Sequence, residues 1–233
     1  MAWSGGSARD DFEINQFSSL ASVEALVLAH RLGCKKFISI GSQAEYGLTT
    51  EIIHERLQCF PVNEFGIAKL NTYYRLRSKA KELGIKMTWL RVLSAYGPFD
   101  RSNSMIMTTI QNLLNGREIK LSKCLHKWDF LHSDDIADAI VGLSTNMGTK
   151  DLYVIGSDDN LKLKCYVREM ISGFTVNEKD IFGKANLDER DLVELQSDST
   201  MLRNDIGWYP KISFAEGIKD LIAREMLKRQ TCK

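Results

Sequence analysis

The sequence lacks most features that mark secreted, membrane-spanning or nucleic-acid-binding proteins. Its 233 residues include only three prolines, and its five cysteines form no C-x-x-C pair, so a secreted disulfide framework is not expected. Its apolar runs fall far short of the roughly 18 residues of a membrane span. The 31 basic and 30 acidic side chains leave a formal charge of +1, too little for a basic nucleic-acid surface. We therefore expect a cytoplasmic globular protein that binds neither nucleic acid nor a membrane.

Two further absences concern ligand sites. The four histidines form no H-E-x-x-H pattern, and no spacing of histidine and cysteine suits zinc, so no metal site is expected. The 16 glycines include no G-x-G-x-x-G, a turn whose backbone N–H groups and following helix N-terminus hold the diphosphate of a dinucleotide. The chain as given therefore has no glycine-rich cofactor turn.

Helical and strand-like segments alternate along the first part of the chain. Apolar spacing and the glycines that follow each helix predict two helix boundaries, at Gly33 and Gly84. The predicted elements are helices over 10–32 and 63–83 and strands over 35–40 and 85–93. Such alternation with short connections is typical of a parallel sheet covered by helices. The sequence therefore predicts an α/β fold.

After Pro98 the pattern loosens but continues. The predicted helices are 104–114, one capped at Ser133, Asp134 or Asp135 and running to about 144, then 164–171, a short one capped at Asp198 and ending at Gly207, and 214–228. The predicted strands are 128–131 and 152–155. In an open parallel sheet, ligands bind beyond the carboxyl ends of the strands. This rule singles out two loops, 41–47 and 93–98.

Five segments, in order, carry a resemblance to a known family. They are Phe37–Gly47 (Phe-Ile-Ser-Ile-Gly-Ser-Gln-Ala-Glu-Tyr-Gly), Asn63–Lys69 (Asn-Glu-Phe-Gly-Ile-Ala-Lys), Leu90–Pro98 (Leu-Arg-Val-Leu-Ser-Ala-Tyr-Gly-Pro), Lys127–Ala137 (Lys-Trp-Asp-Phe-Leu-His-Ser-Asp-Asp-Ile-Ala) and Gly207–Ile218. Together they resemble the extended short-chain dehydrogenase/reductases, the NAD-dependent epimerase/dehydratase group that acts on sugar nucleotides. The resemblance covers nearly the whole chain.

The resemblance implies a Rossmann-like parallel sheet with helices on both faces and a smaller C-terminal substrate-binding part. We assign residues 1–95, with a returning segment near 127–155, to a partial NAD(P)-binding domain. Residues 96–126 and 156–233 then form the substrate-binding part. Residues 2–5 resemble the end of the family's fourth strand. We therefore expect an N-terminally truncated member that lacks the first strands of the sheet.

The resemblance also assigns catalytic positions. It implies that Ser42 holds the substrate oxygen by a hydrogen bond and that Lys69 binds the nicotinamide ribose. The family has a tyrosine as general base four residues before this lysine, on the same helix face, but here the residue is Phe65. Phenylalanine transfers no proton, and the loss of general acid–base catalysis costs about 10²–10⁴-fold in rate. The tyrosines that could substitute, none singled out by spacing, are Tyr46, Tyr73, Tyr74 and Tyr96.

Further candidate residues follow from the same resemblance. The cofactor-binding candidates are Ser42, Lys69 and Ser94, and the substrate-binding candidates are Gln43, Tyr96 and Trp128. The implied cofactor is NAD or NADP. Gln43 and Ala44 stand where the family's 4,6-dehydratases carry Asp-Glu, which argues against dehydration. Trp128 replaces an arginine that contacts the substrate diphosphate in some relatives.

Taken singly, these residues also fit ordinary structural roles. Ser42 could be a turn cap, Lys69 a solvated helix lysine, and the Asp134–Asp135 pair a helix cap. The aromatic residues expected to serve as packing are Tyr46, Tyr96, Trp128, Phe130 and Trp208.

Two hypotheses of function remain. The first is an NAD(P)-dependent epimerase or reductase of a nucleotide-linked sugar, acting by transient hydride transfer. The alternative is a catalytically degenerate or truncated member that serves as a binding or structural partner. Because an incomplete sheet exposes apolar strand edges, we also expect the chain to form a homo-oligomer.

Overall fold

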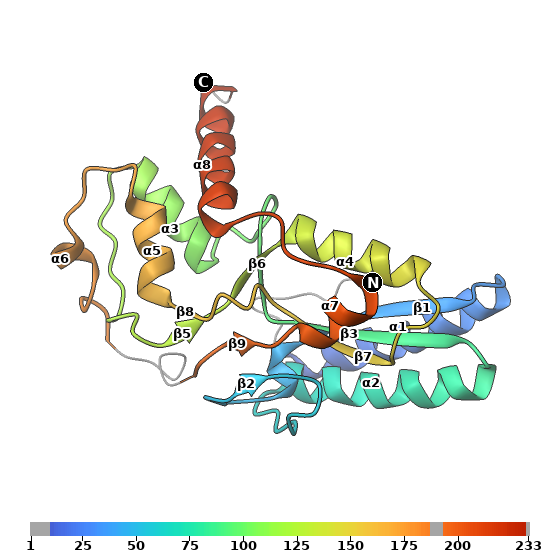
Figure 1. Ribbon diagram of the computed structural model, residues 1–233. Coiled ribbons are helices and arrows are strands. Elements are labelled where there is room, and N and C mark those ends of the chain that lie inside the picture. Colours follow the sequence, from blue (N-terminus) through green and yellow to red (C-terminus); the bar gives the residue numbers. More distant parts are fainter. Residues whose placement is uncertain (1–9, 187–192, 232–233) are drawn as a thin grey trace.

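A three-stranded parallel sheet lies at the centre of the computed structural model, which describes residues 10–186 and 193–231 (Figure 1). Its strands are β1 (Lys36–Ser42), β3 (Lys86–Val92) and β7 (Leu152–Ile155), in the order β1-β3-β7. Ser42 lies opposite Val92, and Val92 lies opposite Ile155. The three carboxyl ends therefore meet at one edge of the sheet, where the sequence rule places a ligand.

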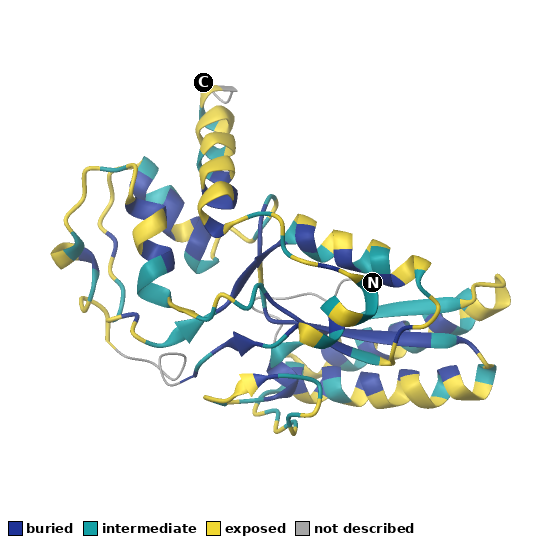
Figure 2. Cartoon of the chain, viewed as in Figure 1, coloured by how far each residue is buried: buried dark blue, intermediate teal, exposed yellow. Residues whose placement is uncertain are grey.

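Helices cover both faces of this sheet, as predicted. Met87 and Trp89 of β3 pack with Leu26 and Leu76 on one face, whereas Leu90 and Val92 pack toward the other. This alternation follows from the two-residue period of a strand. The helices on the first face are α1 (Phe12–Arg31) and α2 (Glu64–Leu83), and those on the second are α4 (Ser133–Thr145) and α7 (Thr200–Ile206). Figure 2 shows their inward faces buried and their outward faces exposed.

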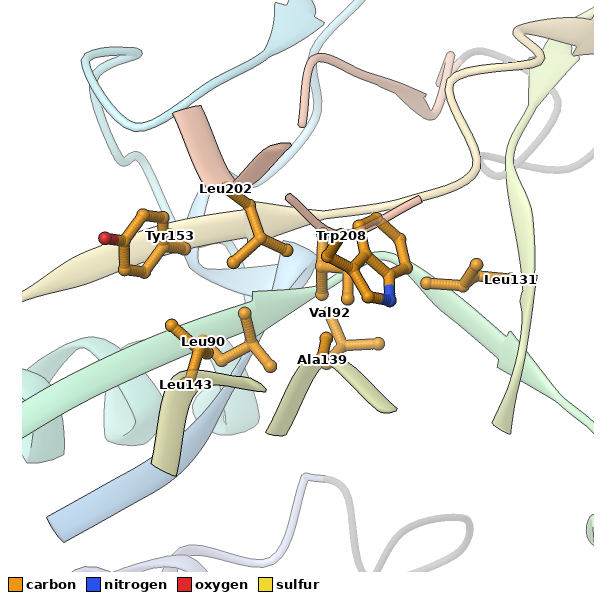
Figure 3. Close-up of a cluster of buried hydrophobic side chains, with 9 residues drawn as sticks. Leu90, Val92, Leu131, Ala139, Leu143, Tyr153, Leu202 and Trp208 are labelled. Carbon is orange, nitrogen blue, oxygen red and sulfur yellow. The ribbon is translucent and has the colours of Figure 1, made fainter. Parts of the chain in front are cut away.

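The second face holds a continuous apolar core (Figure 3). Leu202 of α7 and Trp208, just beyond that helix, lie against the sheet beside Val92. Trp208 also donates its indole N–H to the backbone oxygen of Asp135, at 2.9 Å. The predicted core role of Trp208 is thereby confirmed.

Shorter elements surround the sheet. Parallel pairs join β2 (Ile52–Ile53) to β9 (Gln196–Ser197) and β4 (Ser94–Tyr96) to β6 (Phe130–His132), and an antiparallel pair joins β5 (Lys127–Trp128) to β8 (Leu161–Lys162). The remaining helices are η2 (Gln43–Glu45), α3 (Met105–Leu114), α5 (Leu163–Ile171), α6 (Glu178–Ile181) and α8 (Phe214–Thr231). The first half of α8 packs on α3 and α5, and its second half is largely exposed (Figure 2).

The predicted strand over 128–131 is wrong in one respect, because it is broken at Asp129. The Asp129 carboxylate is fully buried and accepts the N–H groups of Ser157 and Asp158 at 2.7 and 3.1 Å. Its side chain is thus engaged with the loop that follows β7. The two pieces on either side join different neighbours, β8 and β4.

Two predicted helix caps are also wrong. The N-cap of α4 is His132, whose Nδ1 accepts the N–H of Asp134, and not one of the three residues after it. Asp135 instead turns inward and accepts the backbone N–H groups of Lys211 and Ile212 at 2.9 and 3.1 Å. The N-cap of α7 is Ser199, although the Asp198 carboxylate does accept the N–H of Thr200.

Three features of the sequence analysis are not decided by the fold: residues 2–5, Cys232 and the division of the chain into two parts. The strand resemblance at residues 2–5 and Cys232 lie outside the described residues. Among the residues that the structure does describe, no helix is long and apolar enough to cross a membrane, and the cysteines are free thiols. The division into two parts at residues 95, 126 and 156 stays a prediction.

Candidate active site

Ser42 ends β1 and caps the single turn η2. Its Oγ accepts the N–H of Ala44 at 3.2 Å and donates to Oε1 of Gln43 at 2.7 Å. Its backbone N–H donates to Oε1 of Glu45 at 2.8 Å, which completes a capping box. The reciprocal bonds fix both the backbone and the side chain of Ser42 at the edge of the sheet.

Lys69 reaches the same edge from α2. Its side chain is buried, with the residue only 4% exposed, and Nζ donates to the backbone oxygen of Ile40 at 2.8 Å. Gly66, one turn earlier, lets α2 approach η2 closely, because an added Cβ there would lie 2.3 Å from the backbone oxygen of Ala44. The expectation of a solvated helix lysine is therefore wrong for Lys69.

A buried ion pair lies beside these two residues. The Glu45 carboxylate, fully buried, accepts the indole N–H of Trp89 at 3.0 Å and the Nε–H of Arg91 at 2.6 Å. Arg91 also donates Nη1–H to the Tyr46 hydroxyl at 2.9 Å. We call Ser42, Glu45, Lys69 and Arg91 the charged corner.

Burial changes the proton affinities in the charged corner. It lowers the pKa of Lys69 from 10.5 to about 8, and the Glu45 charge opposes this change. Burial also works to lower the pKa of Arg91, but the Glu45 carboxylate beside it outweighs that effect and raises it. Lys69 therefore titrates close to neutrality, whereas Arg91 stays charged.

Phe65 lies half-buried one helical turn before Lys69. Its ring centre is 5.7 Å from Nζ, and the ring of Trp89 is 5.8 Å from the same atom. The lysine ammonium thus lies near two aromatic rings. The ring contributes an apolar surface, but no hydroxyl, at the position that the family resemblance reserves for tyrosine.

The tyrosines considered as replacements are differently placed. The Tyr46 hydroxyl donates to the backbone oxygen of His54 at 3.0 Å, and the Tyr96 hydroxyl donates to that of Ser213 at 3.4 Å. Burial raises the pKa values of Tyr46, Tyr73 and Tyr96, which disfavours the phenolate that a general base requires. Tyr74 is 56% exposed on α2.

The structure gathers the other candidate residues around a second group of rings. Tyr96 lies against Phe130 and Phe214, with ring centres 6.1 and 5.0 Å away. Trp128 is half-buried and stacks obliquely on Phe130 at 6.2 Å, while Ser94 pairs with Phe130 along β4 and β6. We call Tyr96, Phe130, Tyr166 and Phe214 the aromatic cluster. The structure thus brings Ser42, Gln43, Phe65 and Lys69 together at or beside the charged corner. It places Tyr96 in the aromatic cluster, and Ser94 and Trp128 next to it.

Sequence reasoning gave no role to Glu45, Trp89 or Arg91. The signal was present in the motifs: Arg91 stands inside a run of buried strand residues and so requires a buried partner. Glu45 stands three residues after Ser42, the spacing of a capping box. Among the described residues, no group of three or more His, Cys, Asp or Glu side chains is arranged to hold a metal ion.

A parallel sheet with helices on both faces, and with a serine and a buried lysine at the carboxyl end of β1, is an α/β arrangement of the Rossmann type. The model of the NAD dependent epimerase/dehydratase family matches residues 3–156. The chain belongs to this family.

Similar proteins share parts of this sequence. A dTDP-4-dehydro-6-deoxyglucose reductase of Escherichia coli is 26% identical over 195 residues, which is 82% of this chain and 61% of that protein. A dTDP-glucose 4,6-dehydratase of Mycolicibacterium smegmatis is 24% identical over 167 residues, 70% of this chain and 49% of the relative. The chain therefore spans about six tenths or less of the length of these curated relatives.

Solved structures share the fold. RMD from Pseudomonas aeruginosa, complexed with NADPH, superposes with a TM-score of 0.83 at 18% identity, covering 96% of this chain and 78% of that one. A UDP-glucose 4-epimerase from Thermotoga maritima, with UDP-glucose, superposes with a TM-score of 0.79 at 22% identity. The match covers 99% of this chain and 77% of the epimerase chain. These likenesses confirm the Rossmann-like fold.

Proposed function

We propose that the chain takes part in NAD(P)-dependent reduction or epimerisation of a nucleotide-linked sugar by transient hydride transfer. The observation that carries the proposal is the placement of Ser42 and buried Lys69 together at the carboxyl end of β1. Family membership and relatives named for dTDP-sugar chemistry support it. The alternative of a degenerate binding partner draws no support from these comparisons.

The donors at the edge of the sheet fit the nicotinamide half of such a cofactor. The Ser42 hydroxyl and the Lys69 ammonium are hydrogen-bond donors for ribose hydroxyls or a carbonyl oxygen, and Ser94 begins the strand after β3. The sequence has no glycine-rich turn for the diphosphate. A bound nicotinamide would supply or accept the hydride, and either NAD or NADP is compatible with these donors.

The residues of this chain then have distinct roles. Ser42 donates a hydrogen bond to the substrate oxygen once its hydroxyl leaves Gln43, and Lys69 binds the ribose with its ammonium group. Gln43, Tyr96 and Trp128 stay candidates for contacts with the sugar nucleotide. Because Gln43 and Ala44 offer no carboxylate, and that of Glu45 is fully buried and paired with Arg91, the proposal excludes elimination of water at this turn.

Cofactor binding is the first test. The full chain should be titrated with NADH and with NADPH while nicotinamide fluorescence is followed, and saturable binding of one of them is expected. The Lys69→Met variant should bind at least tenfold more weakly, whereas Lys81→Met, on the exposed side of the same helix, should match the wild type. No saturable binding by a chain that circular dichroism shows to be folded would overturn the proposal.

A second copy of this chain is the proposed protein partner. The outer face of α1 exposes apolar side chains, among them Phe17, Leu20 and Leu28, at 73%, 57% and 56%. Exposed apolar groups of this size favour association. Light scattering on the purified chain should show a dimer or larger species, and a monomer at high concentration would contradict this part of the proposal. A cytoplasmic location also stays a prediction.

A further inference from the structure

The proposed reaction needs a group that exchanges a proton with the sugar oxygen. A carbonyl that accepts a hydride becomes an alkoxide and must be protonated, and the reverse reaction must remove the same proton. Phe65 has no exchangeable proton. The buried tyrosines near the charged corner have raised pKa values and hold their protons near neutrality.

Lys69 lies at the edge of the sheet where the substrate oxygen is expected. The backbone N–H of Lys86 in β3 donates to the backbone oxygen of Lys35. Because backbone groups alternate in direction along a strand, the odd-numbered residues of β1 face β3 and the even-numbered residues face away from it. The oxygen of Ile40 and the N–H of Ser42 are therefore on the side of β1 away from β3, where Lys69 and Glu45 bind them. Two residues of a strand span only about 7 Å. To reach a substrate oxygen at Ser42, the flexible Lys69 side chain would have to release the Ile40 oxygen and cross this span.

From this arrangement we infer that Lys69 itself is the proton donor and acceptor of the reaction, in place of a phenol. The inference rests on the proposed function. In reduction, the substrate carbonyl carbon accepts the hydride with its electron pair, and the C=O π electrons move to oxygen. That oxygen takes a proton from Nζ of Lys69, leaving a neutral amine that recovers a proton from water. Oxidation runs the same transfers in reverse.

The groups that face Lys69 support this role. Glu45 of η2 is the nearby anion and is itself paired with Arg91 of β3. The ring centres of Phe65 of α2 and Trp89 of β3 lie 5.7 and 5.8 Å from Nζ. Around the neighbouring Arg91, Tyr46, Tyr73 and Cys59 remain neutral because burial raises their pKa values. Burial brings the pKa of Lys69 to about 8, a value at which a general acid and base works near neutral pH.

Lysine NMR tests the ionisation without any ligand. The full chain is labelled with ¹³Cε-lysine, and the Lys69 signal is assigned by its loss in Lys69→Arg. Its midpoint is expected near pH 8, and Glu45→Gln should move it lower because the opposing anion is gone. Lys81, exposed on the same helix, serves as the internal control. A Lys69 midpoint above pH 10 would overturn the inference.

Rates of reduction separate a proton carrier from a mere cation. With dTDP-4-dehydro-6-deoxyglucose and NADPH or NADH, wild-type kcat should fall above about pH 8, where the ammonium is lost, and oxidation should instead rise through the same pH. Lys69→Arg keeps the charge but holds its proton, so cofactor affinity should stay within a few fold while kcat falls about 10²–10⁴-fold. An arginine variant with wild-type kcat would show that charge alone suffices.

Restoring the phenol is the complementary variant. Phe65→Tyr should add a second proton carrier, and in the double variant Phe65→Tyr with Lys69→Arg it should recover at least tenfold of the lost kcat. No recovery would count against the proton-carrier role. The two proposals fail differently: absent nucleotide binding overturns the proposed function, whereas binding with an ordinary Lys69 midpoint overturns only the inference.

Discussion

The charged corner and the aromatic cluster both lie near ends of strands, yet the first consists of charged and hydrogen-bonding side chains and the second of packed aromatic rings. In the charged corner, the fully buried Glu45 carboxylate accepts the N–H groups of Ser42, Trp89 and Arg91. In the aromatic cluster, Tyr166 packs edge to face on Phe214 with ring centres 4.7 Å apart, and Phe130 stacks on Phe214. We propose that the first region presents charge and hydrogen-bond donors to a ligand, whereas the second is an apolar core of packed rings.

This difference shows that a motif residue acquires its role from its neighbours. Ser42 and Tyr96 both belong to motifs of the same family. Ser42 is held by a charged network with its hydroxyl at the edge of the sheet, whereas Tyr96 is 2% exposed and packs as part of the core. The two regions should therefore respond differently to mutation and to pH.

Removal of the buried carboxylate should have the largest effect. Glu45→Ala leaves the Arg91 guanidinium buried without its partner, which typically costs about 3–5 kcal/mol of unfolding free energy. Urea unfolding followed by circular dichroism measures this loss. Glu82→Ala, which removes an exposed pair with Lys79, should cost less than about 1 kcal/mol. Equal losses of unfolding free energy in the two variants would show that the buried pair stabilises the fold no more than the exposed pair does.

The pH dependence of stability should distinguish the charged corner next. Below pH 8 Lys69 is protonated in both the folded and the unfolded chain, and the folded state bears the cost of burying the ammonium. Between about pH 8 and 10.5 only the unfolded lysine keeps its proton, so the free energy of unfolding should rise with pH, by about 3 kcal/mol over this range. Lys69→Met should lack this rise and Lys81→Met should retain it. Parallel wild-type and Lys69→Met curves would contradict the account.

Two glycine variants compare the regions directly. An added Cβ at Gly66 would meet the backbone of Ala44, and one at Gly217 would meet the Tyr96 hydroxyl, each at 2.3 Å. Gly66→Ala and Gly217→Ala should each cost about 1–3 kcal/mol in urea unfolding. Only Gly66→Ala pushes η2 away from α2, so only this variant should also weaken NADH binding. Equal effects on binding would mean that the charged corner is not where the cofactor lies.

The smallest effect is expected from the hydroxyl of Tyr96. Tyr96→Phe removes one long hydrogen bond to Ser213, and such a bond contributes about 1 kcal/mol. Thermal unfolding should show a shift of only a few degrees, without dependence on pH between 6 and 9. A large or pH-dependent loss would mean that the aromatic cluster also contains a functional ionisation.

The sequence was informative about elements with strong local signals. The predicted helices over 10–32 and 63–83 agree with α1 and α2 to within two residues, because Gly33 and Gly84 adopt the left-handed conformation that ends a helix. The motif order also led to the family and to Ser42 and Lys69 as neighbours of one edge.

Contacts between distant residues were not predictable in the same way. The break at Asp129 depends on the loop 156–158, and the inward turn of Asp135 depends on backbone groups some 75 residues later. The pairing of Glu45 with Arg91 likewise joins two motifs that local patterns treat separately. Lys69 is buried because Gly66 allows α2 to approach η2 closely, and helix propensities do not predict such a contact between two elements.

Hydrogen–deuterium exchange with and without NADPH or NADH tests the central claim most directly, because it locates the cofactor on the chain. The account predicts slower exchange in peptides that cover 38–46 and 64–72, the segments of β1, η2 and α2 that form the charged corner. Peptides over 161–171 and 214–222, which contain Tyr166 and Phe214 of the aromatic cluster, should be unchanged. Protection confined to those later peptides, with 38–46 unaffected, would contradict the assignment of the nicotinamide to Ser42 and Lys69.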